Sequence, residues 1–363
     1  MILLLVGLVV YIASGSWIFL SLVLFICAGY GIGLRVLMHI LLWNALLVFA
    51  LAFFGSRFGI IETILSSRQM ENVVRDSCGF VQVNFVGAAA VRICAAIVAL
   101  RWGKPPRLTV AFCIAIVLFV EFVANSRTAE VCIIIMVALN VLYHSRAQKD
   151  GSIHVNPQRA IALCMAAILV SAGASLALML FFDPGNSVMM QISELLSNRL
   201  YSAWYLSGIY GVSAFGNGMG NLSERLAEVL WTGSSYASAT VDNAWAAWAI
   251  SYGLVPTLLA IAGFAILFKS LYTKRLMNGY VLVLTVLTAF YAFCESSALS
   301  FDMNPVLALL SIPIFEETGT RLFSVRTVDL AETNALKNGR VPVEREPRAT
   351  IASVCWKRGE GKW

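Results

Sequence analysis

Long runs of apolar residues, separated by short polar breaks, dominate this chain. A helix needs about 20 apolar residues to cross a membrane. Runs near that length predict spans at 17–34, 36–54, 80–100, 108–124, 129–143, 160–182, 243–268, 276–294 and 299–315. Residues 2–13 are also apolar, but this run is short and stops at Ser14-Gly15-Ser16, so we expect a tenth span or a packed half-span. The pattern predicts an all-α, polytopic transmembrane helical bundle of about 9–10 spans.

The composition favours lipid rather than water as the surroundings of this bundle. Apolar residues make up 59% of the 363 residues and charged residues only 13%, about half the charged fraction of soluble domains. Within lipid the backbone must satisfy its own hydrogen bonds, which helices do. A membrane β-barrel alternates apolar and polar residues over segments of about ten residues, and the continuous runs in this chain exclude it.

The eight cysteines and three histidines indicate neither a disulfide framework nor a metal centre. No two cysteines are spaced as C-x-x-C, and no Cys/His group has metal-ligand spacing. Five cysteines lie inside apolar runs, where a thiol packs as a small apolar group: Cys27, Cys94, Cys113, Cys132 and Cys164. We therefore expect no metal and no other cofactor. The net charge of +6 is spread over short loops and a tail, which fits membrane orientation better than nucleic-acid binding.

Lysine and arginine in short loops predict the orientation of the bundle, because such loops stay in the cytoplasm. Three loops that alternate correctly carry these residues: Arg101, Lys104 and Arg107; Arg146, Lys149 and Arg159; Lys269, Lys274 and Arg275. We expect residues 1–317 to form a membrane domain in the cell membrane and residues 318–363 to form a flexible cytoplasmic tail. The long segment 183–242 then faces outward, and we expect an amphipathic interfacial helix at 190–205.

Six arginines lie in or beside the segments expected outside: Arg57, Arg68, Arg75, Arg127, Arg199 and Arg225. A guanidinium binds two phosphate oxygens at once and stays charged, which suits a site for a lipid-linked diphosphate. The alternative is that arginines anchor helix ends at the interface. Arg127 stands between two apolar runs with almost no loop, where a charge is costly and usually functional. Arg92, well inside its span, either lines a cavity or extends toward the cytoplasmic end.

Carboxylates are the candidate bases, since all three histidines lie at or near the expected cytoplasmic face. Asp242, beside Asn243, precedes the span that follows the long loop, and Glu295 ends a later span. Each could instead mark a helix boundary, and Asp is well suited to cap a helix. A glycine-rich stretch at 215–220 lacks a preceding strand and a G-K-[ST] ending, so it is no nucleotide phosphate loop; an ordinary glycine turn is the alternative.

Taken in order, five short patches resemble the O-antigen polymerase and O-antigen ligase superfamily. They are Arg75-Asp76-Ser77-Cys78-Gly79-Phe80 with Asn84 (R-x-x-x-G-F-x-x-P-N), Asn125-Ser126-Arg127-Thr128 (S-R-T), Asn198-Arg199 with Trp204 and Phe215-Gly216-Asn217-Gly218 (R…W…F-G-x-G), Val241-Asp242-Asn243 with Tyr252-Gly253 (D-N-x-y…y-G), and Glu295 with Asn304-Pro305 (E…N-P). The likeness extends from about residue 70 to residue 315. Val83 and Gln82 depart from the Pro and His that the family often has.

The resemblance implies a C-type glycosyltransferase-like fold with a large extracytoplasmic loop and a metal-independent reaction. Family members of the polymerase (Wzy) type join undecaprenyl-diphosphate-linked oligosaccharide repeat units at the outer face of the membrane, giving an O-antigen, capsule or exopolysaccharide. Asp242 stands where ligases tend to carry His, which favours a polymerase over ligase-type transfer to another acceptor. Implied partners are these lipid-linked oligosaccharides, membrane lipid, a chain-length regulator and a flippase.

The resemblance also implies the site residues. The catalytic group would be Arg199, Arg127, Asp242 and Glu295, with arginine stabilising the departing diphosphate and a carboxylate assisting the attacking hydroxyl. The substrate-binding group would be Arg75, Asn84, Arg92, Trp204, Gly216, Asn217, Gly218, Arg225 and Asn243. A polytopic transporter and a non-catalytic scaffold are the alternatives, although the chain shows no internal repeat of the transporter kind. We further expect Arg127 and Arg199 to lie close together, with Arg75 near them.

Overall fold

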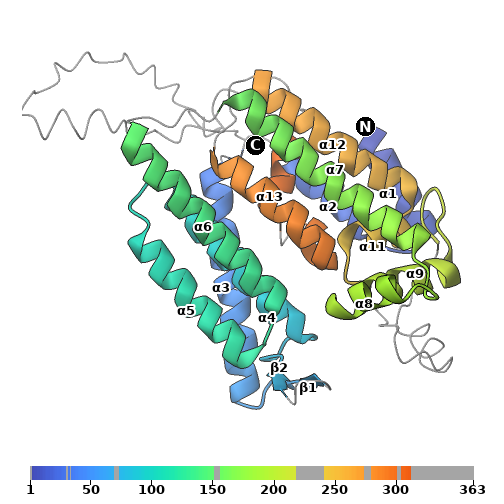
Figure 1. The fold of residues 1–363 in the computed structure, drawn as a ribbon, viewed down its shortest axis with the longest axis horizontal. Coiled ribbons are helices and arrows are strands. Elements are labelled where there is room, and N and C mark those ends of the chain that lie inside the picture. The colour runs from blue at the N-terminus through green and yellow to red at the C-terminus, as the bar shows by residue number, and fades with distance from the viewer. Residues whose placement is uncertain are drawn as a thin grey trace, which may run out of the picture. The chain divides into compact units, whose positions relative to one another are not determined.

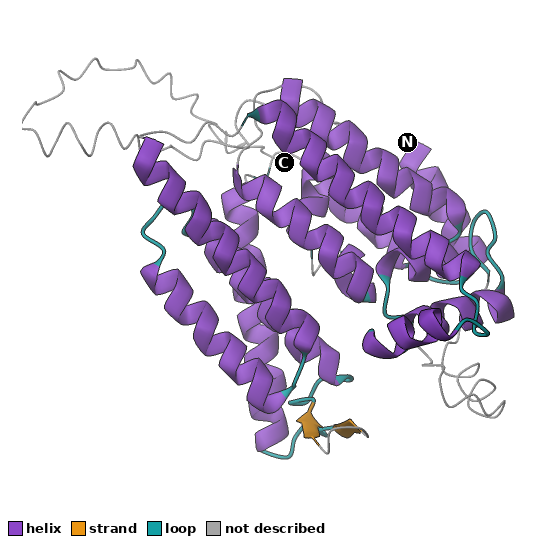
Figure 2. Cartoon of the chain, viewed as in Figure 1, coloured by secondary structure: helices purple, strands orange, loops and turns teal. Residues whose placement is uncertain are grey.

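The computed structural model describes residues 2–29, 32, 34–68, 73–150, 156–217, 241–273, 279–300 and 304–311. The chain divides into two units, Met1–Val325 and Arg326–Trp363. The second unit, and with it the tail expected at 318–363, lies outside the described residues. The described part of the first unit is almost entirely helical (Figures 1 and 2).

Nine apolar helices make up the described bundle: α1 (Ile2–Ser14), α2 (Ile18–Ala28), α3 (Leu34–Arg57), α4 (Val83–Leu100), α5 (Arg107–Val123), α6 (Arg127–Asp150), α7 (Pro157–Phe181), α12 (Leu254–Thr273) and α13 (Gly279–Cys294). Five of these, α3, α4, α6, α7 and α12, are long and apolar enough to cross a membrane, whereas α1, α2 and α13 are apolar but shorter. The fold is therefore an all-α bundle of membrane-type helices, as the apolar pattern predicts.

Three predicted spans differ from the helices that form. The run 243–268 forms two helices, α11 (Ala244–Ser251) and α12, because Gly253 takes a φ of 94° and breaks the helix between them. The run 17–34 gives only the 11 residues of α2. In the described part of 299–315, the short 3-10 helix η2 (Pro305–Leu310) follows the 3-10 helix η1 (Ser296–Leu299), which ends where the predicted span begins. Pro305 has no amide hydrogen to continue a preceding helix. The number of spans stays a prediction, because residues 301–303 and 312–315 of the last expected span lie outside the described residues.

The long segment after α7 begins with two short helices, α8 (Ser187–Leu195) and α9 (Arg199–Tyr210), which lie beside α11 at one end of α7 (Figure 1). The single helix expected at 190–205 is wrong, because Ser197 and Asn198 take left-handed φ values of 58° and 61° and separate the two helices. Buried Leu206 on α9 packs in one apolar cluster with Met179 of α7. Residues 218–240 lie outside the description.

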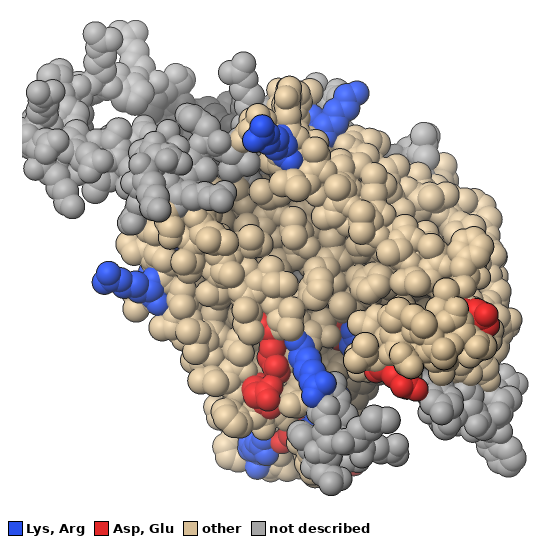
Figure 3. Space-filling view, viewed as in Figure 1, with Lys and Arg blue, Asp and Glu red and all other residues tan. Residues whose placement is uncertain are grey.

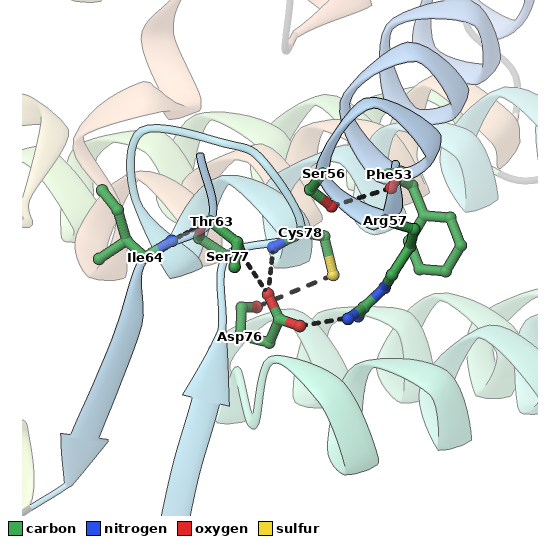
Figure 4. Close-up of polar contacts among 8 residues, drawn as sticks. All are labelled: Phe53, Ser56, Arg57, Thr63, Ile64, Asp76, Ser77 and Cys78. Atoms are coloured by element: carbon green, nitrogen blue, oxygen red, sulfur yellow. Dashed lines mark hydrogen bonds and ion pairs between the residues drawn. The ribbon is translucent and has the colours of Figure 1, made fainter. Parts of the chain in front are cut away.

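Between α3 and α4 the chain forms an antiparallel pair, β1 (Leu65–Arg68) with β2 (Val73–Asp76). Asp76 joins this hairpin to the end of α3 (Figure 4). Its carboxylate accepts hydrogen bonds from Thr63 Oγ1 at 2.6 Å, from Arg57 Nη2 at 2.7 Å and from the backbone N of Cys78 at 2.7 Å. The hairpin therefore holds a fixed place at the end of α3.

Close helix packing brings the distant segments of the site together. On α4, a Cβ at Gly87 would lie 2.5 Å from Ser126 Oγ, so only glycine lets α4 approach the start of α6 this closely. At the centre of the bundle, Trp245 Nε1 donates to Ser171 Oγ at 3.0 Å, and that hydroxyl donates to the Ala289 carbonyl at 2.6 Å. These buried bonds connect α11, α7 and α13.

Candidate functional site

Arg199, the first residue of α9, forms an ion pair with Glu295, which directly follows α13. Arg199 Nη2 lies 2.8 Å from Glu295 Oε1, and the two side chains are only 15% and 7% exposed. Nη1 of the same guanidinium donates to the Cys294 carbonyl and lies 3.4 Å from Thr128 Oγ1 at the start of α6. One largely buried arginine thus connects the long loop, α13 and α6.

Asp242 and Arg75 share the electrostatic field of this pair. Burial raises the pKa of Glu295 to about 7 against the opposing effect of Arg199; Asp242 adds to the rise, and Arg75 lowers it. For Arg199, burial acts to lower the pKa, but attraction to Glu295 and Asp242 outweighs it and raises the value. We call these four residues, Arg199, Glu295, Asp242 and Arg75, the charged cluster, because Asp242 and Arg75 both act on the pKa of Glu295.

Arg75, a member of this cluster, is held by the turn after α5 and by the start of α4. Its Nε donates to the Ala124 carbonyl at 2.8 Å, and its Nη2 donates to Asn84 Oδ1 at 3.0 Å. Asn84, in the first turn of α4, therefore positions Arg75. The segment 124–128, which leads from α5 into α6, contacts Arg75 through Ala124 and Arg199 through Thr128, so it lies between these two arginines. Arg127, the first residue of α6, is itself exposed.

Several non-glycine residues near the site have a left-handed backbone conformation. The non-glycine residues Cys78, Asn125 and Asn198 have φ values of 48°, 45° and 61°. This conformation costs roughly 1–2 kcal/mol for most residues and is easiest for Asn and Asp. The chain turns sharply at Asn125 and Asn198, directly before the helices that begin with Arg127 and Arg199. Such strained positions cluster where surrounding structure fixes a functional geometry.

Asn243 fixes the start of α11 next to Asp242. Its Oδ1 accepts from the Ala246 backbone N at 3.0 Å, and its Nδ2 donates to Ser175 Oγ at 2.8 Å and to the Phe293 carbonyl at 3.1 Å. Asn243, and not Asp242, is therefore the helix cap, so the alternative role considered for Asp242 is wrong. Because Phe293 lies two residues before Glu295, this amide also sets the distance between the two carboxylate-bearing segments.

The glycine-rich stretch and the Tyr252-Gly253 turn pack against each other. A Cβ on Gly216 (φ 97°) would lie 2.4 Å from the Ser251 carbonyl oxygen, and one on Gly253 (φ 94°) would lie 2.5 Å from the Gly216 backbone N. Asn217 Nδ2 donates to the carbonyls of Tyr210 and Gly211 at 2.6 and 2.9 Å and so closes the end of α9. Gly216 and Asn217 thus hold the backbone of the loop. Gly218 and Arg225 lie outside the described residues.

Aromatic side chains gather on α9 one turn beyond Arg199. The Trp204 ring centroid lies 5.6 Å from that of Tyr201 and 6.1 Å from that of Phe182. Tyr201 also stacks on Tyr205 at 6.0 Å. This group offers flat apolar surface with hydroxyl groups beside the charged cluster. Of the sequence-derived candidates, Arg92 lies elsewhere, in a cavity between α3 and α4.

Two groups that bind Arg199 are absent from the predicted site residues. Thr128 lies in the S-R-T patch but has no predicted role, and the Cys294 carbonyl has no sequence identity. Asp76, which orders the hairpin next to Arg75, could have been found from its place directly beside that arginine. Among the described residues, no group of three His, Cys, Asp or Glu side chains is placed to share a metal ion.

The face of the molecule in Figure 3 carries few charges, and there acidic and basic side chains lie side by side at one position.

Comparison with known proteins gives no matching family model, no matching curated sequence and no matching solved structure. The arrangement of Arg75, Arg199, Asp242 and Glu295 is therefore the main guide to function.

Proposed function

We propose that this chain is a membrane glycosyltransferase that polymerises undecaprenyl-diphosphate-linked oligosaccharide repeat units into a surface polysaccharide at the outer face of the cell membrane. The observation that supports this most is the meeting of two arginine-led helices. Arg127 begins α6 and Arg199 begins α9, and Arg199 reaches Thr128 in the first turn of α6. Arg75 adds a third cation through its contact with the turn before α6.

Such an arrangement suits a multivalent anion. The N-terminal end of a helix carries partial positive charge and unsatisfied backbone N–H groups. A cation at that end is unfavourable by itself, so an arginine there gains from an anionic partner. Glu295 supplies one negative charge to Arg199 in the described structure. A diphosphate, with more charge and more oxygens, would bind the same arginines bidentately.

In the proposed reaction, the acceptor sugar hydroxyl attacks the anomeric carbon of the donor glycan. The new glycosidic C–O bond forms as the bond from that carbon to the diphosphate oxygen breaks, and the bonding pair leaves with the lipid diphosphate. Arg199 and Arg75 would stabilise the charge that develops on this leaving group. The hydroxyl proton would pass to Glu295, whose pKa of about 7 suits a general base.

Substrate binding would prepare Glu295 for this task. While Arg199 pairs with Glu295 it weakens the carboxylate as a base. A diphosphate that takes over the guanidinium would remove this effect and raise the proton affinity of Glu295. Asp242 would act as the second carboxylate, keeping negative charge beside Arg199. The rings of Trp204, Tyr201 and Tyr205 would provide a surface for sugar rings.

The direct test is reconstitution. The purified chain is placed in lipid vesicles with lipid-linked oligosaccharides extracted from source cells that lack its gene. We expect a ladder of polymers that differ by one repeat unit, with one lipid diphosphate released for each bond formed. Single transfer to a different acceptor would support ligase-type activity instead. Vesicle-bound protein that folds but releases no lipid diphosphate above the level of an Arg199→Ala, Glu295→Ala double variant would overturn the proposal.

A further inference from the structure

A separate polar position lies between α3 and α4. A cavity of about 280 Å3 there is lined by two polar residues, Asn44 and Arg92, and by five apolar ones, Val48, Phe80, Phe85, Ala88 and Ala89. Arg92 lies on the same stripe of α4 as Asn84, two turns farther along, because residues four apart share a helix face. The cavity is therefore a neighbour of the charged cluster but has its own walls.

The floor and the mouth of this cavity differ in exposure. Arg92, Ala88 and Ala89 form the floor, since they are only 6%, 2% and 3% exposed. Val48 and Phe85, each 40% exposed, and the exposed Asn44 lie at the mouth. The mouth is thus on the flank of the helix pair. Because α3 and α4 are both long and apolar enough to cross a membrane, this flank would face lipid once the helices span one.

We propose that this cavity is a binding site for a membrane lipid that carries an anionic phosphate ester or carboxylate. Arg92 would bind the anionic oxygens, Asn44 would donate a further hydrogen bond, and Val48, Phe80 and Phe85 would contact the chain. A few converging polar groups in an otherwise apolar pocket are typical of ligand sites. The size of the cavity suits a head with the first part of a chain rather than a whole lipid.

Placing Arg92 here is costly unless the position has a use. A charged side chain within a membrane span is unfavourable by several kcal/mol and usually faces a functional cavity. An arginine that only anchored the helix would extend its guanidinium to the aqueous end. The side chain of Arg92 instead remains 94% buried, as its 6% exposure shows, at the floor of a cavity that is open to lipid. A neutral lipid would use the apolar walls but not the guanidinium.

The site and its test do not depend on glycosyl transfer. The purified chain is titrated with phosphatidylglycerol, with phosphatidylcholine of the same acyl chains, with oleate and with inorganic phosphate, and bound species are counted by native mass spectrometry. We expect phosphatidylglycerol or oleate to bind at least about tenfold more tightly than phosphatidylcholine. Arg92→Gln should remove this preference, and Asn44→Leu at the exposed mouth should weaken it. Arg107→Gln, at the exposed start of α5, serves as the matched charge control and should leave it unchanged.

Four results would overturn the proposal. Equal binding of anionic and neutral lipids by the unaltered chain would show that Arg92 does not select lipids by their charge. An unchanged preference in Arg92→Gln, or an equal loss in Arg107→Gln, would place the anion elsewhere. Binding of inorganic phosphate as tight as that of the lipids would mean a site for a free ion. Filling the floor by Ala88→Leu should also displace the lipid, and Asn44→Leu provides the independent test if that variant unfolds.

Discussion

Arg199 and Glu295 are 96 residues apart in the chain, yet their side chains meet at 2.8 Å in a largely buried ion pair. Taking two charges out of water costs several kcal/mol per ion, so such a pair is weak evidence of a stabilising role. Here Asp242 and Arg75 act on the charge of the same pair. The cost is better explained by a site that must present cations and a carboxylate together.

Glu295 should make stability depend on pH. Its pKa is raised from 4.5 to about 7 in the folded chain, so between these pH values the folded state keeps a proton that the unfolded state has released. Folding stability contributed by this group is therefore highest below pH 4.5 and falls as pH rises toward 7. The Gln side chain of Glu295→Gln does not titrate. The thermal unfolding midpoint of this variant minus that of the unaltered chain should therefore increase from pH 5 to pH 8. Parallel pH profiles for both proteins in detergent would contradict the assignment.

Asp76 should stabilise the hairpin that carries Arg75. Burial acts to raise its pKa, but hydrogen bonds from Thr63 and Cys78 and the charge of Arg57 outweigh this and lower it below 3.8. The resulting stability is present above pH 3.8 and is lost as pH falls through the folded-state pKa. Asp76→Ala, which removes all three hydrogen bonds, should cost about 1–2 kcal/mol of unfolding free energy, measured at neutral pH.

The partner Arg57 provides the matched comparison for Asp76. Its side chain is 48% exposed, and exposed ion pairs contribute about 0–1 kcal/mol. Arg57→Gln should therefore destabilise the chain less than Asp76→Ala, which also removes the acceptor of the hydrogen bonds from Thr63 and Cys78. A larger effect of Arg57→Gln would mean that the ion pair, and not the hydrogen-bonded turn, orders the hairpin.

Gly253 should tolerate no side chain. Its φ of 94° is unfavourable for other residues, and a Cβ would lie 2.5 Å from the Ala214 carbonyl. Strain of this kind costs about 1–3 kcal/mol, so Gly253→Ala should lower the thermal midpoint clearly. Gly173, inside α7, is the control because a Cβ added there would enter open space, and Gly173→Ala should be stabilising by up to about 1 kcal/mol. Similar midpoints for both variants would contradict the packing described.

The apolar pattern predicts the long helices because burial in lipid depends on run length alone, and α3, α4, α6, α7 and α12 all follow it. The apolar pattern misses the break at Gly253 because helices tolerate a single glycine inside an apolar run. The φ of 94° that breaks the helix is set by packing on Ala214. The pattern also misses the break at Ser197 and Asn198, where no proline or glycine marks the turn.

The site could be predicted only in part. Arg75, Arg199, Asp242 and Glu295 were identifiable as charges in or beside the segments expected outside, and two of them, Arg199 and Glu295, meet in an ion pair. The distances between them depend on contacts such as Asn243 to Phe293 and Arg75 to Ala124. Each of these contacts joins a side chain to a backbone carbonyl that is 50 or 49 residues away in the sequence. No local sequence pattern encodes such a contact.

Arg199→Lys should separate a substrate-binding role from an anchoring role. Lysine keeps the charge but replaces the planar fork, which reaches Glu295, Thr128 and the Cys294 carbonyl, with a single point of contact. If Arg199 stabilises a departing diphosphate, loss of that donor should reduce the rate by about 10²–10³ and lower kcat more than it raises KM. An arginine that only anchors the interface would be replaced by lysine without loss.

The measurement is the rate of lipid-diphosphate release in vesicles, with polymer length in cells as the second readout, at matched protein level. Arg107→Lys, on the exposed first residue of α5, controls for any general effect of replacing arginine and should retain full activity. A folded Arg199→Lys variant with the same rate and the same length profile as the unaltered chain would remove Arg199 from the reaction. The Arg199–Glu295 pair would then be a structural link between α9 and α13, and the proposed mechanism would fail with it.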